Sequence, residues 1–335
     1  MPPSVAAILV RTIVSIIVAI PFAGRILLLR ICGLIVGLLL GCGNANAEAI
    51  QPLLPAEVAI NKDAGRGGWV IISLRMESDE ELRMIVDTGA PGTLLDKSLE
   101  PKLGNRLDTG TIRSFRGEQE GDLYAAPTFY LGDVPLMGNS NLLTADFKKL
   151  LPPLDPPVLG ILGMDCLRHY CLQVDFEAGK MRFLDSHHFN ADGLGKGYPL
   201  KFATDAEHHG IPLIQHAGLL GGTATNTVID TGHNGDGAVE GRAIRRHAAG
   251  SYSGGLVKRF KHFLAVHGLV NRDVGLPGCV WDGNTYTNIV VGRRSGDLPN
   301  WIGIRFLARH LVTFDFPNQM MYLKQTSTGP LGAAD

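Results

Sequence analysis

Two stretches of the chain carry the same order of apolar and polar segments. In each, an apolar run follows a glycine, at residues 68–74 and 210–214, and a polar turn leads to a second run at residues 82–86 and 225–229. Short runs of this kind, bounded by turn residues, are typical of buried β-strands. Because each second run leads directly into Asp-Thr-Gly, the pattern predicts one β-rich unit that occurs twice.

A glycine after two apolar residues marks the later part of each unit. These glycines are Gly163 and Gly303, and each precedes a helix-like piece and then a strand. Asp87 lies 76 residues before Gly163, Asp230 lies 73 residues before Gly303, and each glycine lies 12 residues before an Asp-Phe pair. A tripeptide repeated by chance would not bring this context with it, so the sequence indicates an internal duplication.

Composition favours strands throughout both units. The sequence has 42 glycines, 19 prolines and many short apolar runs, with little sustained 3.6-residue periodicity. We therefore expect an all-β protein with two related lobes, each closed and barrel-like. A third Asp-Thr-Gly, at Asp108, follows polar residues and has no glycine landmark of its own. We interpret this copy as unrelated to the duplication.

The first 47 residues differ from the rest, because they are almost entirely apolar and contain no acidic side chain. The run at residues 31–40, preceded by arginines, has the length and flanks of a signal-peptide core. Three interpretations stay open: lipidation of Cys42 after a Leu-Leu-Gly-Cys motif, cleavage after Ala47, and an uncleaved anchor. All three predict an exported protein that is periplasmic in a bacterium, anchored to the membrane or extracellular.

Charge and cysteine content narrow the function further. The formal net charge of −1, without a basic block after the leader, gives no electrostatic footprint for nucleic acid. No Cys-x-x-Cys or His-Glu-x-x-His spacing occurs, so we expect neither a metal site nor a cofactor. The cysteines after the leader are Cys166, Cys171 and Cys279. In an oxidising compartment they predict one disulfide and one free thiol, with the pairing left open.

The two aspartates that follow the strands suit hydrolysis by a carboxylate pair. Two close carboxyl groups cannot both ionise, so one remains a general base while the other stays protonated and polarises a carbonyl group. A glycine near each aspartate lets the backbone turn tightly and lets a substrate approach, and the threonine hydroxyls are expected to lock the turns to each other. The predicted site consists of the catalytic residues Asp87 and Asp230, supported by Thr88, Gly89, Thr231 and Gly232.

These residues resemble the retropepsin-like aspartic peptidases, whose signature elements are Ile-Val-Asp-Thr-Gly-Ala and a later apolar-apolar-glycine. The resemblance covers about residues 59–323. It implies two such lobes fused in one chain, as in pepsin-like enzymes, with the active-site cleft between them. It also implies that Gly163 and Gly303 pack beside the catalytic loops. A hairpin flap should close over the substrate, and the candidates are residues 114–121 and 250–255.

The resemblance divides the chain into lobes. The linker between them is placed where the sequence is polar and contains glycine. The predicted segments are a leader at 1–47, a linker at 48–57, an N-terminal lobe at 58–185, a linker at 186–197, a C-terminal lobe at 198–325 and a tail at 326–335.

The function that the resemblance implies is that of an aspartic endopeptidase acting on a peptide or protein through an activated water. We expect a monomer, with a homodimer as the alternative. Two other interpretations stay open: an enzyme active only as a dimer that pairs two first lobes, and a catalytically silent peptide-binding protein.

His233 is one reason for keeping these alternatives. Active family members usually place a small residue after Asp-Thr-Gly; Ala90 fits this pattern, and His233 does not. Three roles stay open for its imidazole: a position outside the site, a hydrogen bond to Asp230 that lowers the pKa of that carboxyl, or a sign that this lobe has lost catalysis.

Overall fold

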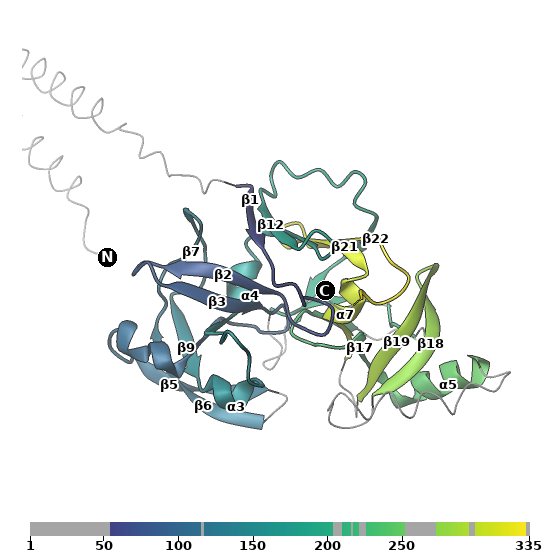
Figure 1. Cartoon of the computed structure of the whole chain (residues 1–335), viewed down its shortest axis with the longest axis horizontal. Coiled ribbons are helices and arrows are strands. Elements are labelled where there is room, and N and C mark those ends of the chain that lie inside the picture. Colours follow the sequence, from purple (N-terminus) through teal and green to yellow (C-terminus); the bar gives the residue numbers. More distant parts are fainter. Residues whose placement is uncertain are drawn as a thin grey trace, which may run out of the picture. The chain divides into compact units, whose positions relative to one another are not determined.

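The computed structural model in Figure 1 describes residues 54–114, 117–203, 210–215, 217–220, 226–251, 273–294 and 299–332. The segment Pro52–Asp335 forms one compact unit. The predicted leader, with Cys42 and Ala47, lies outside the described residues. Among the described helices, none is long and apolar enough to cross a membrane.

The first lobe contains a nine-stranded sheet. Its strands are β2 (Ile71–Met76), β3 (Glu81–Val86), β4 (Leu94–Asp96), β5 (Asp108–Ser114), β6 (Gly117–Ala125), β7 (Phe129–Leu131), β8 (Val134–Pro135), β9 (Asn141–Ala145) and β10 (Gly160–Leu162). They lie in the order β5-β6-β9-β4-β10-β3-β2-β7-β8. Three short helices accompany them: the 3-10 helix η1 (Lys97–Lys102), α3 (Phe147–Leu150) and α4 (Met164–Leu167).

The second lobe contains a seven-stranded sheet. Its strands are β14 (Lys201–Phe202), β15 (Pro212–Ile214), β16 (Thr227–Asp230), β17 (Gly237–Glu240), β18 (Val274–Trp281), β19 (Asn284–Arg294) and β20 (Asn300–Gly303). They lie in the order β14-β15-β16-β20-β17-β19-β18. Among the described residues of this lobe, the helices are α5 (Gly241–Ser251) and α7 (Ile304–Leu307).

The same strand pairing recurs around the two predicted turns. In the first lobe, β10 runs parallel to β3 and antiparallel to β4. In the second, β20 runs parallel to β16 and antiparallel to β17. Helices α4 and α7 begin directly after Gly163 and Gly303, which confirms the helix-like pieces expected there. Asp87 and Asp230 therefore stand at equivalent ends of equivalent strands.

Strands from both lobes build a third, six-stranded sheet. Its members are β1 (Ala56–Ala59), β11 (Cys171–Asp175), β12 (Lys180–Leu184), β13 (Lys196–Pro199), β21 (His310–Asp315) and β22 (Met320–Gln325). Their order is β1-β12-β11-β21-β22-β13, so β11 and β21 are neighbours in the middle of the sheet. Leu172 pairs with Phe314 there, which means that the two matched strands of the duplication contact each other directly.

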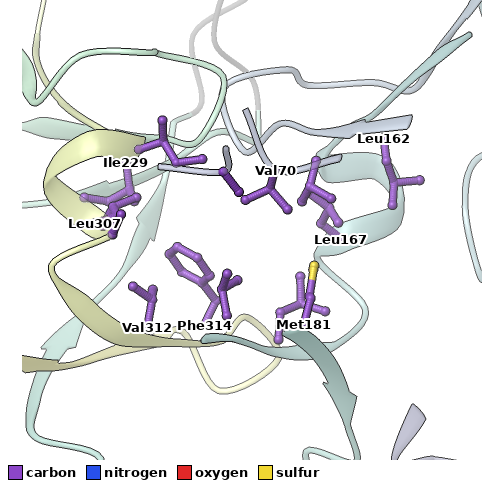
Figure 2. Packing of buried hydrophobic residues seen from close by; sticks show 14 of the residues in the cluster. Val70, Leu162, Leu167, Met181, Ile229, Leu307, Val312 and Phe314 are labelled. Carbon is purple, nitrogen blue, oxygen red and sulfur yellow. The ribbon is translucent and has the colours of Figure 1, made fainter. Parts of the chain in front are cut away.

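Buried apolar side chains of both lobes pack in one cluster (Figure 2). Val70, Leu162 and Met181 come from the first lobe, and Ile229 and Phe314 come from the second. Burying one such side chain is favourable by about 1.5–3 kcal/mol. Because both lobes contribute to this cluster, its packing holds the strands that end at Asp87 and Asp230 in a common core.

The all-β, two-lobed architecture is confirmed, with one qualification on closure. Among the described residues, the nine-stranded sheet begins at β5 and ends at β8, and the seven-stranded sheet begins at β14 and ends at β18. The hydrogen-bonded pairings thus leave two edges in each sheet, where a closed barrel would leave none. The boundaries drawn for the lobes and linkers stay predictions.

The expected disulfide is absent from the structure. Cys166, Cys171 and Cys279 are all free and buried. Burial raises the pKa of all three thiols, that of Cys279 to about 11. Since the thiolate is the form that reacts, oxidation of these side chains is disfavoured by their surroundings. They serve as small apolar core residues instead.

Candidate active site

The first Asp-Thr-Gly turn begins where β3 ends. The amide of Asp87 donates to the carbonyl of Leu162 in β10, at 3.0 Å, which holds the start of the turn against the neighbouring strand. The amide of Gly89 donates to Oδ1 of Asp87 at 2.7 Å. Asp87 is half-buried. The turn thus presents a carboxylate that accepts a hydrogen bond from the backbone of the same turn.

The second turn has the same construction. Asp230 is the last residue of β16 and is buried, with 4% of its surface exposed. Its Oδ1 accepts hydrogen bonds from the amides of Gly232 at 2.8 Å and His233 at 3.0 Å. Two amide donors to one carboxylate oxygen favour the ionised form of that group.

The two threonines connect the turns reciprocally. The amide of Thr88 donates to Oγ1 of Thr231 at 2.9 Å, and the amide of Thr231 donates to Oγ1 of Thr88 at 3.0 Å. Each hydroxyl in turn donates to the strand of the opposite lobe, at the carbonyls of Ile229 and Val86, both at 2.7 Å. Both side chains are buried, so these four bonds are shielded from water and hold the two turns in register.

The carboxyl groups of the two turns face each other, and each lies against the glycine of the opposite turn. A Cβ atom added at Gly89 would lie 2.5 Å from Cγ of Asp230, and one added at Gly232 would lie 2.5 Å from Cγ of Asp87. Each of the two carboxyl groups acts on the pKa of the other, in agreement with this proximity. Glycine is therefore required at these positions by the carboxylate across the gap as well as by the turn itself.

We expect Gly232→Ala to reduce peptide cleavage by about a hundredfold, because the added methyl group must push the second turn away from Asp87 and a displacement of about 1 Å has a cost of that size. Cleavage assays on purified protein measure the effect. Gly138→Ala is the matched control, since an added Cβ there meets its nearest neighbour only at 4.0 Å. Equal activities of the two variants would contradict this interpretation of Gly232.

The two later glycines pack against the turns, as the resemblance implied. A Cβ atom at Gly163 would lie 2.5 Å from the carbonyl carbon of Gly92, and one at Gly303 would lie 2.5 Å from Cδ2 of His233. The residues after these glycines donate their amides to the turns: Met164 to the carbonyl of Ala90 at 2.8 Å, and Ile304 to that of His233 at 2.9 Å. The first residues of α4 and α7 are therefore hydrogen-bonded to the loops that carry the aspartates.

The environment of the pair raises the pKa of both carboxyl groups. Burial is the main cause at Asp87, and the charge of Asp230 adds to it, whereas the amides of Gly89 and Ala90 oppose the rise. Burial also raises the pKa of Asp230, against the amides of Gly232 and His233. Asp87 accepts one amide bond within 3.0 Å and Asp230 accepts two, so the backbone favours the ionised form of Asp230 more strongly. The pair therefore retains one proton above the ordinary aspartate pKa of 3.8.

His233 contributes to the site through its backbone. Its amide donates to Asp230, while its imidazole lies against Gly303 and close to Gly235. Burial lowers the pKa of this imidazole, and the charges of Asp273 and Asp236 oppose that change. Of the three roles left open by the sequence, a position of the imidazole outside the site fits this geometry, and the hydrogen bond to Asp230 comes from the backbone amide instead.

Three charged residues beside the second turn were not identified from the sequence. Nη1 of Arg305 lies 2.6 Å from Oδ2 of Asp236, and Nη2 of Arg309 lies 2.8 Å from Oδ1, with the side chains of Asp236 and Arg309 fully buried. At the matching positions of the first lobe, Thr93 donates to Asp165 at 2.7 Å. The internal repeat could have revealed these residues. Thr93 and Asp236 both lie six residues after the aspartate of their lobe, and Asp165 and Arg305 both lie two residues after the later glycine of their lobe.

The predicted flaps are described only in part. Strands β5 and β6 form an antiparallel hairpin with Ser114 paired to Gly117, and residues 115 and 116 between them lie outside the described residues. Most of the second candidate, residues 250–255, also lies outside them. The third Asp-Thr-Gly is part of β5, where Asp108 is exposed and pairs with Leu123. It forms no turn, in agreement with its interpretation as unrelated.

No metal site emerges from the part of the chain that the structure describes, where no group of three or more His, Cys, Asp or Glu side chains is placed to hold an ion.

Comparisons with known proteins agree with this architecture. Residues 72–166 match the family model described as aspartyl protease. Among solved structures, an aspartic proteinase from Irpex lacteus has a TM-score of 0.52 at 14% identity, covering 82% of this chain and 98% of its own. Basic 7S globulin from soybean has a TM-score of 0.53 at 11% identity, and the match covers 83% of this chain and 96% of the globulin chain.

No curated protein matches the sequence significantly. At such low identities the structural likeness shows the fold alone, while the family model matches the first lobe directly. Residues 72–166 thus match the model of the aspartyl protease family, and the described chain has the two-lobed fold of pepsin-like aspartic proteinases.

Proposed function

We propose that this protein is an aspartic endopeptidase that hydrolyses peptide bonds with a water molecule activated by Asp87 and Asp230. The observation that supports this best is the meeting of two carboxyl groups from equivalent turns, each against the glycine of the other turn. The buried threonine bonds add support, because a catalytic pair needs fixed geometry before substrate arrives.

In the proposed mechanism Asp230 is the general base and Asp87 is the general acid. Asp230 accepts two amide bonds within 3.0 Å, whereas Asp87 accepts one, so Asp230 carries the negative charge more readily. The water oxygen attacks the carbonyl carbon of the peptide as Asp230 takes the water proton and Asp87 gives its proton to the carbonyl oxygen. When the tetrahedral species collapses, the C–N bond breaks as Asp230 gives its proton to the leaving amine. A hydroxyl of the tetrahedral species returns a proton to Asp87 as the new carbonyl forms, which restores the singly protonated pair.

The pH dependence of cleavage tests the role of the pair. Activity needs one proton on the two carboxyls, so it is lost at low pH when Asp230 gains a proton and at high pH when Asp87 loses its own. Because burial raises the pKa of both groups, we expect both limbs of the kcat/KM profile above the ordinary aspartate value of 3.8. A denatured protein substrate digested across pH 3–9 measures this. Maximal activity with both limbs below that value would contradict the proposed pair.

The pair is formed within one chain, which favours a monomeric enzyme over a dimer of two first lobes. Size-exclusion chromatography of the active species distinguishes the two.

The other alternative is a catalytically silent peptide-binding protein. The likeness to basic 7S globulin supports it, because the name of that protein describes a globulin and not a protease, although its fold is similar. A statine-type transition-state mimic that binds this protein, with no cleavage of any substrate, would support the silent form.

The proposed setting is outside the cytoplasm, with a peptide or protein as substrate and the leader as the export signal. This part of the proposal rests on the sequence of residues 1–47. Mass spectrometry of the mature N-terminus tests it, because cleavage after Ala47, a lipid on Cys42 and an intact leader have different masses.

A further inference from the structure

Trp69 connects the first lobe to the second Asp-Thr-Gly turn. It stands two residues before β2, and its Nε1–H donates to the carbonyl oxygen of Gly232 at 2.7 Å, across 163 residues of sequence. Its half-buried ring packs against an apolar cluster of the first lobe that includes Ile71, Ile85 and Phe147. The ring is therefore held by one lobe while its N–H group binds the other.

The carbonyl that Trp69 binds belongs to the peptide unit that supports Asp230. The oxygen of Gly232 and the amide of His233 are the two ends of one peptide bond, and that amide donates to Oδ1 of Asp230 at 3.0 Å. A peptide group whose oxygen accepts a hydrogen bond is polarised and donates more strongly from its N–H. The indole, the peptide and the carboxylate thus form a continuous chain of hydrogen bonds.

This support is present on one side of the pair. Ile71 pairs with Ile85 in the first lobe and Leu213 pairs with Val228 in the second, and both partners lie two residues before their aspartate. The position equivalent to Trp69 is therefore Ile211, which is buried and has no side-chain donor. Among the described residues, the indole contact made to the turn of Asp230 therefore has no counterpart from Ile211 at the turn of Asp87.

We propose that Trp69 is a positioning residue for the second turn: its indole N–H fixes the carbonyl of Gly232 and strengthens the hydrogen bond that the His233 amide donates to Asp230. This inference deepens the proposed function and rests on it for its catalytic meaning. It assigns the two carboxyls their unequal roles by a contact from the opposite lobe.

The ionisable groups around Asp230 are compatible with an effect of Trp69 on the pKa of this carboxyl. Asp87 faces it across the gap and is the side chain that acts on it directly. The imidazole of His233 lies against Gly303, with the carboxylates of Asp236 and Asp273 acting on it. Backbone amides, and the indole behind one of them, are the donors that stabilise the Asp230 carboxylate.

Trp69→Phe tests the proposal, because it keeps an aromatic ring and removes the donor. Loss of the donor weakens the ionised form of Asp230, so the pKa of that group and the acidic limb of kcat/KM should both rise, by about half a pH unit. The alkaline limb of the kcat/KM profile should remain at the same pH, because Asp230 is ionised both before and after Asp87 loses its proton. Carbon-13 NMR of aspartate carboxyls follows the titration directly, with Asp230→Asn to assign the signal.

Trp281→Phe is the matched control, since Trp281 is a buried indole that stacks on Tyr198 in the second-lobe core. A shift in Trp69→Phe alone supports the proposal. No shift, or the same shift in both variants, overturns it. A wild-type protein that cleaves no peptide would refute the proposed function, and a shifted NMR titration in Trp69→Phe would then still support the hydrogen-bond chain.

A measurement on the unaltered protein keeps the test independent of variant folding. The Nε1–H proton resonance of Trp69 should show an inflection at the pH where the Asp230 carboxyl titrates. Absence of that inflection overturns the proposal.

Discussion

Asp230→Asn is expected to abolish detectable cleavage of a denatured protein substrate, with a loss in kcat of about a hundredfold to ten-thousandfold from the missing general base. The amide oxygen of asparagine can still accept the bonds from Gly232 and His233, so the turn should persist. Asp87→Asn should have an equal effect, since one carboxyl of the pair cannot perform both proton transfers. A continuous peptide cleavage assay near the optimum of the wild type measures both variants.

Asp108→Asn is the control for these two variants. It makes the same change in an Asp-Thr-Gly tripeptide, but Asp108 is exposed in β5, so its activity should equal that of the wild type. Retained cleavage in either Asp87→Asn or Asp230→Asn would refute the single pair.

Thermal unfolding separates lost chemistry from lost folding. A carboxyl whose folded pKa is raised costs stability as pH rises from its unfolded pKa through its folded one, because the folded state then binds more protons than the unfolded state. Removing Asp230 should therefore leave Tm at neutral pH unchanged or higher.

Asp236→Asn is expected to lower the free energy of unfolding by about 3–5 kcal/mol, because it removes the charge that pairs two arginines in a buried site. The side chains of Asp236 and Arg309 are fully buried, and Asp236 also accepts the amide of Val290 at 2.7 Å. The remaining guanidinium of Arg309 would stay away from water without its counterion. Urea denaturation followed by circular dichroism measures the change.

An exposed ion pair provides the comparison for Asp236. Arg113 and Glu118 lie 2.7 Å apart with side chains 63% and 61% exposed, so Glu118→Gln should change stability by less than about 1 kcal/mol. The double variant Asp236→Leu/Arg309→Met should be more stable than Asp236→Asn, because the fully buried guanidinium of Arg309 is removed together with its partner. A loss below about 1 kcal/mol in Asp236→Asn would show that the network does not support this lobe.

Much of the fold could be read from local patterns and spacing. The apolar runs before Asp87 and Asp230 became β3 and β16, and the glycines at 163 and 303 became the starts of α4 and α7. These features are local, since strand and helix signals extend over a few residues, and the duplication let each half support the interpretation of the other. The prediction of a disulfide was wrong because the number of cysteines and the expected compartment do not reveal whether two thiols come close enough to bond.

The charged and aromatic supports of the site could not be found in the same way. Asp236 and Arg309 form their ion pair across 73 residues, and neither residue belongs to a motif by itself. Trp69 has the polarity of an ordinary core residue in a strand-like run, and nothing near it in sequence indicates a hydrogen-bond partner. Only the repeat alignment offered a signal, by placing Asp236 opposite Thr93 and Trp69 opposite Ile211.

The sequence by itself determined that two equivalent turns each end a buried strand with an aspartate, because strand pattern, turn chemistry and spacing are properties of neighbouring residues. The tertiary structure decided that these turns meet, that Thr88 and Thr231 bond across 143 residues, and that Trp69 reaches Gly232 across 163. Such contacts depend on how separate strands pack around a common core. Burial in that core, which no local pattern specifies, also raises the pKa of both carboxyls.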